Sequence, residues 1–245
     1  MKWVTHFLVV FFALFLVLPV NAQRYHVGVM GGLNFADLDS DIFDFAGEFV
    51  GDISRITVYG IGGVVDINLY RNIYLHLEPM YLQRGGVLET NLAPVIPEDV
   101  PFDISIPGID LTFKSSYIEI PVLLKTEFGN NVRPYLLAGP TIGLLLSSSI
   151  EAEVFGIGIK CDMKDVTESV NFGFAFGTGL CVPFGTGSLF LEGRYTIGMI
   201  DLFKEGTLEI GGGPIEIQET IVEEDKVVKT NGLQIMLGVT MPLSR

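Results

Sequence analysis

The 245-residue chain carries a formal net charge of −14, and 49% of its residues are hydrophobic while only 18% are charged. An acidic chain with 15 Lys and Arg residues lacks the clustered positive charge that phosphate contacts need, which excludes nucleic-acid binding. The large apolar fraction excludes intrinsic disorder. Two cysteines exclude a disulfide-stapled scaffold and a multi-thiolate zinc site.

The first 22 residues have the three parts of a secretory signal peptide. Lys2 supplies the positive charge, residues 3–18 are almost wholly apolar, and small residues precede a cleavage site after Ala22. The alternative is a transmembrane helix, but the apolar run is roughly 16 residues long and a span needs about 20. We therefore predict a signal peptide over 1–22 and one barrel domain over 23–245.

Strict alternation of large and small residues is the main pattern of the mature chain. In residues 170–182, Phe172, Phe174 and Phe176 share one face, while Gly173 and Ala175 share the other. A strand places such residues on opposite sides, whereas a helix would scatter them. A soluble sandwich would show a charged second face, so the Gly and Ala face is typical of a crowded barrel interior.

Seven further segments alternate in the same way. The eight predicted strands are 25–35, 57–69, 73–83, 116–126, 133–146, 170–182, 188–200 and 232–242. Each has about the length that a tilted strand needs to cross a bilayer. The connections are alternately tight (69–72, 127–132 and 183–187) and long (36–56, 84–115, 147–169 and 201–231).

This pattern predicts an all-β fold, an eight-stranded antiparallel transmembrane β-barrel with short periplasmic turns and long extracellular loops. Residues 207–221 also alternate and are interpreted as a hairpin that projects beyond the membrane. A ten-stranded barrel that includes this hairpin is the alternative.

The acidic residues test the barrel hypothesis. Of the 29 Asp and Glu residues, 24 fall within 36–55, 87–112, 147–169 and 201–229, and a twenty-fifth, Glu127, is expected in a turn. The other four are expected on the polar faces of strands. None lies on an apolar face, where a charge at the membrane midplane costs a few kcal/mol. The acidity is therefore expected to concentrate in the extracellular loops.

Six segments carry a resemblance to a known family, namely GVMGGLNF (28–35), LHLEPMYLQRG (75–85), SYIEIPVLLK (116–125), RPYLLAGPTIG (133–143), LEGRYTIGM (191–199) and LQIMLGVTMPL (233–243). In order and spacing they resemble the PorT-type outer-membrane β-barrel proteins of Gram-negative bacteria. The resemblance implies a barrel and an outer-membrane location. It implies no particular chemistry, although some members are tied to the secretion or assembly of other proteins.

Charged residues on the polar faces are the candidate site. The lumen-facing candidates are Asp66, His76, Glu78, Glu119, Lys125, Glu192 and Arg194. Side chains fill an eight-stranded barrel, and buried charges must be paired. We therefore expect an internal plug of ion pairs, with Arg194 bridging carboxylates such as Glu78 or Glu192. A polar transport path and catalysis are the alternatives.

The first long loop offers a weak metal-ligand pattern. The side chains at calcium-loop spacing are Asp37, Asp39, Asp41 and Glu48. Ile42 stands where such a loop needs glycine, so a solvated acidic loop is the simpler interpretation, with loose divalent-cation binding as the alternative. Cys161 and Cys181 are expected at opposite barrel ends, without a disulfide.

The sequence predicts no cofactor. It holds no nucleotide-binding fingerprint, nucleophile elbow or zinc-spaced histidine pair. The leading hypothesis is a non-enzymatic outer-membrane barrel that has a structural or interaction role through its acidic loops, linked to secretion or assembly of other proteins. The alternatives are a narrow channel for small or hydrophobic solutes, a lipid-modifying enzyme and a soluble periplasmic barrel. Expected partners are outer-membrane lipid, the barrel assembly machinery, a basic or secreted protein, and divalent cations at the loops.

Overall fold

The computed structural model describes residues 25–40, 50–90, 110–154, 157–202, 207–211, 216–220 and 228–243. The predicted signal peptide and its cleavage site lie outside the described residues. The strands are β1 (Tyr25–Ser40), β2 (Val50–Ser54), β3 (Ile56–Tyr70), β4 (Ile73–Leu77), β5 (Met80–Thr90), β6 (Asp110–Glu127), β7 (Arg133–Val154), β8 (Ile157–Asp162), β9 (Val170–Phe184), β10 (Gly187–Gly198), β11 (Thr207–Gly211), β12 (Glu216–Thr220) and β13 (Val228–Pro242).

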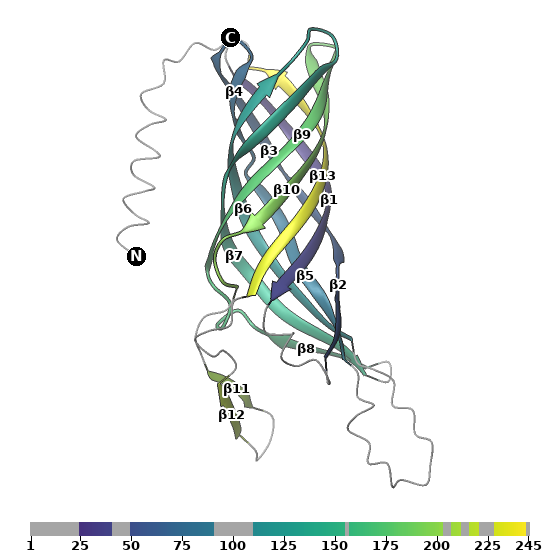
Figure 1. Cartoon of the computed structure of the whole chain (residues 1–245), viewed down its shortest axis with the longest axis vertical. Helices are drawn as coiled ribbons and strands as arrows, with labels where there is room; N and C mark the ends of the chain where they lie inside the picture. Colours follow the sequence, from purple (N-terminus) through teal and green to yellow (C-terminus); the bar gives the residue numbers. More distant parts are fainter. Residues whose placement is uncertain are drawn as a thin grey trace, which may run out of the picture.

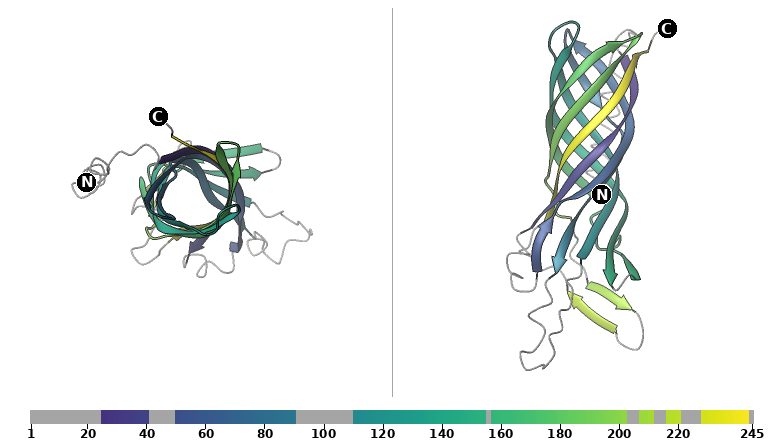
Figure 2. Two further views of the ribbon diagram at one scale, coloured as in Figure 1. Left: turned by 90° about the horizontal axis from the view of Figure 1, so that it is seen from above. Right: turned by 90° about the vertical axis from the view of Figure 1, so that its right-hand side faces the viewer.

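Eight strand positions close into an antiparallel ring (Figures 1 and 2). The order around the ring is β1, β3, β4 with β5, β6, β7, β9, β10 and β13, and β13 pairs with β1. Closure satisfies the backbone hydrogen bonds that an open edge would leave exposed to lipid. The predicted eight-stranded barrel is confirmed. The ten-stranded alternative is wrong, because β11 and β12 pair with each other in a separate two-stranded sheet.

One ring position is divided between β4 and β5. Both strands pair with β3 and with β6, and Glu78 and Pro79 separate them. Proline has no backbone N–H to donate to a ladder, which interrupts the strand at this point. The Pro79 carbonyl still accepts a hydrogen bond from the Gly63 amide at 2.9 Å, so the ring continues across the break.

The strands run well beyond the predicted limits at one end of the barrel. β6 has 18 residues and β7 has 22, while β2 adds to β5 and β8 adds to β7 (Figure 1). We call this end the loop end and the opposite end, with the short turns, the turn end. The predicted loop 84–115 is too long, because β5 continues to Thr90 and β6 begins at Asp110. Strand pairing continues there after the apolar alternation stops.

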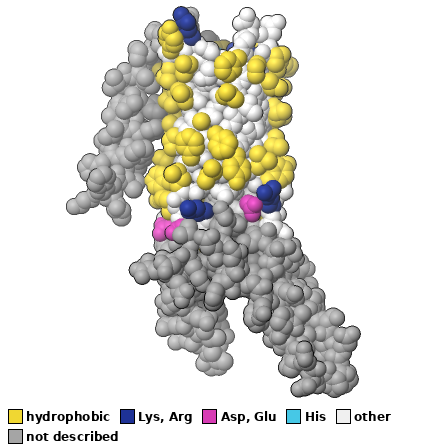
Figure 3. Space-filling view, in the orientation of Figure 1, with side chains coloured by type: hydrophobic (Ala, Val, Ile, Leu, Met, Phe, Trp, Pro, Cys, Tyr) yellow, Lys and Arg dark blue, Asp and Glu magenta, His cyan; other side chains and the backbone are white. Residues whose placement is uncertain are grey.

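The outer wall of the ring is apolar (Figure 3). Along β13 the outward and exposed side chains are Leu233, Ile235, Leu237, Val239 and Met241. Aromatic side chains mark both ends of this wall, with Tyr70 and Phe184 exposed near the turn end and Tyr59 exposed towards the loop end. Aromatic rows of this kind border the apolar band of outer-membrane barrels. No helix in the described ranges is long and apolar enough to cross a membrane.

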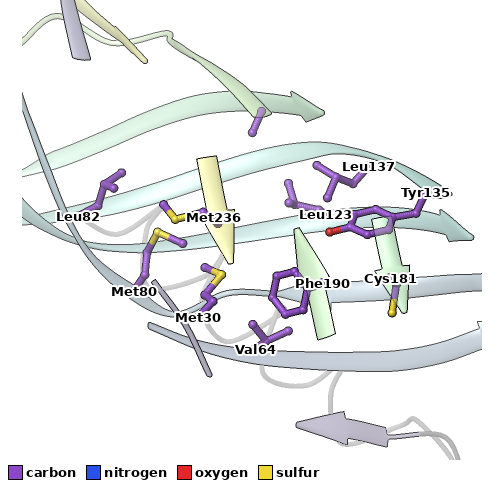
Figure 4. Close-up of a cluster of buried hydrophobic side chains, with 11 residues drawn as sticks. Met30, Val64, Met80, Leu82, Leu123, Tyr135, Leu137, Cys181, Phe190 and Met236 are labelled. Carbon is purple, nitrogen blue, oxygen red and sulfur yellow. The ribbon is translucent and has the colours of Figure 1, made fainter. Parts of the chain in front are cut away.

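Two apolar clusters fill part of the interior. The larger cluster lies inside the ring and consists of Met30, Val64, Met80, Leu82, Leu123, Tyr135, Leu137, Ala175, Cys181, Phe190 and Met236 (Figure 4). The smaller one lies at the loop end and consists of Phe113, Met163, Leu202 and Val228. The inner face is therefore less polar than predicted. An eight-stranded lumen is narrow enough for side chains to fill it, and apolar side chains fill part of it here.

Inward glycines make room for the inward aromatic rings. A Cβ atom at Gly179 would lie 2.3 Å from Cζ of Tyr135, and one at Gly238 would lie 2.3 Å from Cζ of Phe190. Because real Cβ atoms do not approach other atoms so closely, the ring occupies the space that a larger residue would need. The Gly-rich inner face thus determines where the aromatic side chains can pack.

We predict that Gly238→Val lowers the free energy of unfolding by about 1–3 kcal/mol, because the new side chain overpacks Phe190 and the Val29 carbonyl. The matched control is Gly193→Val, since a Cβ there meets no atom within 4 Å. Urea unfolding of both variants in detergent measures the difference. Equal midpoints for the two variants would contradict this account of the inner face.

Candidate functional site: the lumen network

The inward residues of β6 mark successive levels along the lumen. From the turn end to the loop end they include Glu127, Lys125, Glu119, Ser115 and Phe113, all of them buried. The strand carries them at every second position, because alternate side chains point to the same face. Each level is completed by side chains from other strands of the ring.

At the turn end, four charged groups form a chain. Arg133 Nε lies 3.4 Å from Glu127 Oε2, Lys125 Nζ lies 3.1 Å from Glu127 Oε1, and Lys125 Nζ lies 3.0 Å from Asp66 Oδ2. Lys125 also lies 4.6 Å from the centre of the Tyr135 ring, a cation–π contact. Glu127 was expected in a turn, but it is the last residue of β6 and its side chain is buried. Lys125 and Arg133 both pair with its carboxylate there.

Next along the lumen, both ring nitrogens of His76 contact carboxylates. Nδ1 makes a short hydrogen bond to Asp66, which is opposite His76 in the β3–β4 register. Nε2 lies 2.7 Å from Oε1 of Glu78. All three side chains are buried. Each ring nitrogen of His76 therefore has a carboxylate partner.

Arg194 contacts two carboxylates at the same depth. Its guanidinium pairs closely with Glu78, and Nη1 lies 3.2 Å from Glu192 Oε1. Its Nε donates to Gln234 Oε1 at 2.6 Å, and the Tyr135 hydroxyl donates to Glu192 Oε2 at 3.0 Å. The predicted bridging by Arg194 thus involves both carboxylates. We call Asp66, His76, Glu78, Glu192 and Arg194 the central cluster.

A second buried pair lies nearer the loop end. Arg84 Nη2 makes a short ion pair with Glu119, and Arg84 Nη1 donates to Thr230 Oγ1 at 3.1 Å. The guanidinium also lies 5.9 Å from the centre of the Tyr117 ring. Sequence reasoning missed Arg84 because it was assigned to a loop. The available signal was the alternation of Met80, Leu82 and Arg84, which continues past the predicted strand end.

Hydroxyl groups and apolar side chains close the loop end. Ser115 and Ser148 hydroxyls lie 3.2 Å apart, and Thr167 donates to Ser148 at 2.9 Å or to the Met163 carbonyl at 2.7 Å. Met163 belongs to the apolar loop-end cluster that also includes Phe113. The segment after β8 is thereby tied to the inner walls of β6 and β7.

The structure places all seven candidate charges inside the ring, and it brings five of them together in the central cluster. Lys125 joins this cluster through Asp66, whereas Glu119 pairs separately with Arg84. The buried carboxylates of the lumen are Asp66, Glu78, Glu119, Glu127 and Glu192, and the permanent cations that pair with them are Arg84, Lys125, Arg133 and Arg194.

Two of the four weak calcium-loop candidates lie in a strand. Asp37 and Asp39 lie in β1, where Asp39 is opposite Lys229, and Asp37 Oδ2 lies 3.0 Å from Arg55 Nε. Strand geometry separates alternate side chains along a line and does not wrap them around an ion. Asp41 and Glu48 lie outside the described residues.

The two cysteines are free, in agreement with the expected absence of a disulfide between them. Cys161 is exposed on β8 at the loop end, and Cys181 is buried on β9 near the turn end. Their positions place the two sulfur atoms at opposite ends of the barrel.

A small ion-pair cluster lies on the outer surface at the loop end. Glu151 of β7 accepts hydrogen bonds from Lys114 and Lys160, each at 3.0 Å. These hydrogen bonds hold the pKa of Glu151 below its ordinary value, because they favour the ionised carboxylate. The cluster links β6, β7 and β8 where the sheet extends past the apolar wall.

Three solved structures are similar to the chain over most of its length. At 10% identity, the chain resembles Ail, the attachment invasion locus protein of Yersinia pestis, with a TM-score of 0.38 over 89% of this chain and 99% of that one. It resembles the outer membrane protease OmpT of Escherichia coli at 10% identity, with a TM-score of 0.40 over 92% and 98%. For the N-terminal β-barrel domain of Pseudomonas aeruginosa OprF the identity is 14% and the TM-score 0.29, over 88% and 98%.

No curated protein matches the chain. The model of one protein family, the outer membrane protein beta-barrel domain, matches residues 21–204. This match covers the barrel from β1 to β10, including every member of the central cluster. The chain therefore belongs to the outer membrane protein beta-barrel domain family, and this membership implies a location in the outer membrane.

Proposed function

We propose that this protein is a non-enzymatic outer-membrane barrel with a closed lumen, and that it acts through its loop end in a structural or interaction role. The central cluster is the observation that carries the proposal. Its side chains come from different strands and meet in the middle of the lumen, where all of them are buried. Such a network occupies the path that a solute would need.

The chemistry of the cluster supports permanent closure. Opening a path would separate Arg194 from Glu78 and Glu192. Each ion that stayed buried without its partner would raise the free energy by several kcal/mol. The apolar side chains in Figure 4 fill the lumen beside the charges. A channel for small or hydrophobic solutes would need both sets of side chains to move.

The loop end supports an interaction role. The four acidic stretches hold 24 of the 29 acidic residues, and β2 and β8 widen the sheet on this side of the barrel. Concentrated negative charge attracts basic surfaces and divalent cations. We propose a basic or secreted protein as the partner, and the PorT-type resemblance supports a link to secretion or assembly. Outer-membrane lipid and the barrel assembly machinery are the partners proposed for the barrel itself.

Single-channel recording tests the closed lumen. We predict that the mature protein, inserted into a planar lipid bilayer, gives no reproducible conductance steps, because the central cluster blocks the lumen. A general porin from the same preparation serves as the insertion control. Reproducible steps that change in size in Glu78→Gln would overturn the closed-lumen proposal and favour the narrow channel.

A further inference from the structure

Three potential metal ligands converge within the central cluster. They are Nε2 of His76, a carboxylate oxygen of Glu78 and a carboxylate oxygen of Glu192, and these atoms lie within 4.8 Å of one another. All three side chains are buried. His76 lies on β4, Glu78 directly follows β4, and Glu192 lies on β10, so the ring brings the ligands together from distant parts of the chain.

The groups around these atoms are arranged as orienting partners. Asp66 accepts a hydrogen bond from Nδ1 of His76 and is itself paired with Lys125 at 3.0 Å. A carboxylate on the far nitrogen is the usual way in which a metal-binding histidine is held in one tautomer, with Nε2 free to bind. Arg194 contacts the opposite oxygen of each glutamate, which leaves Oε1 of Glu78 and Oε2 of Glu192 facing His76.

We propose that His76, Glu78 and Glu192 bind one divalent transition-metal ion of the zinc type. One imidazole and two carboxylates are ligands that zinc accepts. The three carboxylates Asp66, Glu78 and Glu192 outnumber Lys125 and Arg194, the permanent cations paired with them, so a further cation is favoured at this point. The proposal goes beyond the function above and does not depend on a closed lumen.

Two separations between ligand atoms can be compared with those around a bound zinc ion. His76 Nε2 lies 2.7 Å from Glu78 Oε1 and 3.8 Å from Glu192 Oε2. Ligand atoms around a tetrahedral zinc ion, with bonds of about 2.0–2.2 Å, lie about 3.4 Å apart. The two separations lie on either side of this value. To admit the ion, the Glu78 carboxylate would have to move away from Nε2 of His76 and the Glu192 carboxylate would have to move towards it.

Binding at this site would differ from loose binding by the acidic loops, because it requires His76. The other charged and titratable groups beside the three ligands are Asp66, Lys125, Arg194 and Tyr135.

The first test compares two histidine variants. The mature protein, refolded in detergent with Zn²⁺ and then dialysed, should retain about one equivalent of zinc. His76→Gln should bind zinc at least about 10-fold more weakly, as expected for the loss of a ligand. His26→Gln is the matched control, because His26 packs against Tyr74 and should leave binding unchanged. Equal zinc retention in His76→Gln and the native protein would overturn the proposal.

A second test measures the response in the native sequence and needs a variant only for assignment. After removal of the predicted signal peptide, His26 and His76 are the only histidines. In ¹⁵N-histidine spectra, Zn²⁺ should shift the Nε2 resonance of one ring strongly and leave the other nearly unchanged. Spectra of His26→Gln assign the responding ring. A response by His26 alone, or by neither ring, would overturn the proposal.

Discussion

Replacing Arg194 with methionine is expected to lower the free energy of unfolding by about 3–5 kcal/mol. The side chain is almost fully buried, and its guanidinium contacts both Glu78 and Glu192. Methionine fills a similar volume but leaves the two carboxylates without their shared cation. A buried charge without a partner is more costly than the loss of the pair itself.

Urea unfolding followed by far-ultraviolet circular dichroism measures this effect. Trp3 is the only tryptophan and lies in the predicted signal peptide, so tryptophan fluorescence cannot follow the mature barrel. Arg55→Met is the matched control, because Arg55 is exposed and its ion pair with Asp37 is at the surface, where such pairs contribute about 0–1 kcal/mol. Adding Glu78→Gln and Glu192→Gln to Arg194→Met should recover much of the loss. If Arg194→Met and Arg55→Met unfolded alike, the central cluster would not be a buried charge network.

Leu237→Arg is expected to destabilise the barrel in the membrane by about 2–4 kcal/mol. Leu237 points outward, is 54% exposed, and lies at the middle of the outward row of β13. An arginine there would be placed in hydrocarbon, far from either surface. The effect in lipid should therefore be larger than the loss of side-chain packing alone would produce.

The control is a second arginine substitution on the same strand, at a different depth in the membrane. Met241 is 57% exposed on the same strand and the same face, but it lies next to the turn end. Met241→Arg should cost about 0–1 kcal/mol, because the long side chain reaches the interface. Both variants are measured by unfolding from lipid vesicles. Equal costs at the two positions would show that the apolar wall in Figure 3 does not face hydrocarbon.

The ring strands could be predicted because their periodicity is local. Along β9 the large residues Phe174 and Phe176 point outward while Ala175 between them is buried, as their alternation indicated. The strand ends at the loop end could not be predicted in the same way. Beyond the bilayer the outward side chains need not be apolar, so the alternation stops where β5 still pairs with β6.

The candidate site could be predicted only in part for a related reason. The inward face of a strand follows from alternation, which placed Glu192 and Arg194 on one side. The partners of a side chain depend on the register between strands, which the sequence does not show. Glu127 and Arg84 were missed because each lies just beyond the part of its strand where the alternation was clear.

By itself, the sequence determined which residues face lipid and which face the lumen, because a period of two is a property of each strand alone. It also determined that 25 of the 29 acidic residues fall outside the eight alternating segments. Only the tertiary structure decided that His76 contacts Asp66 and Glu78, and that Arg194 contacts Glu78 and Glu192. Those contacts depend on ring closure and on the stagger of neighbouring strands, which bring together side chains more than a hundred residues apart.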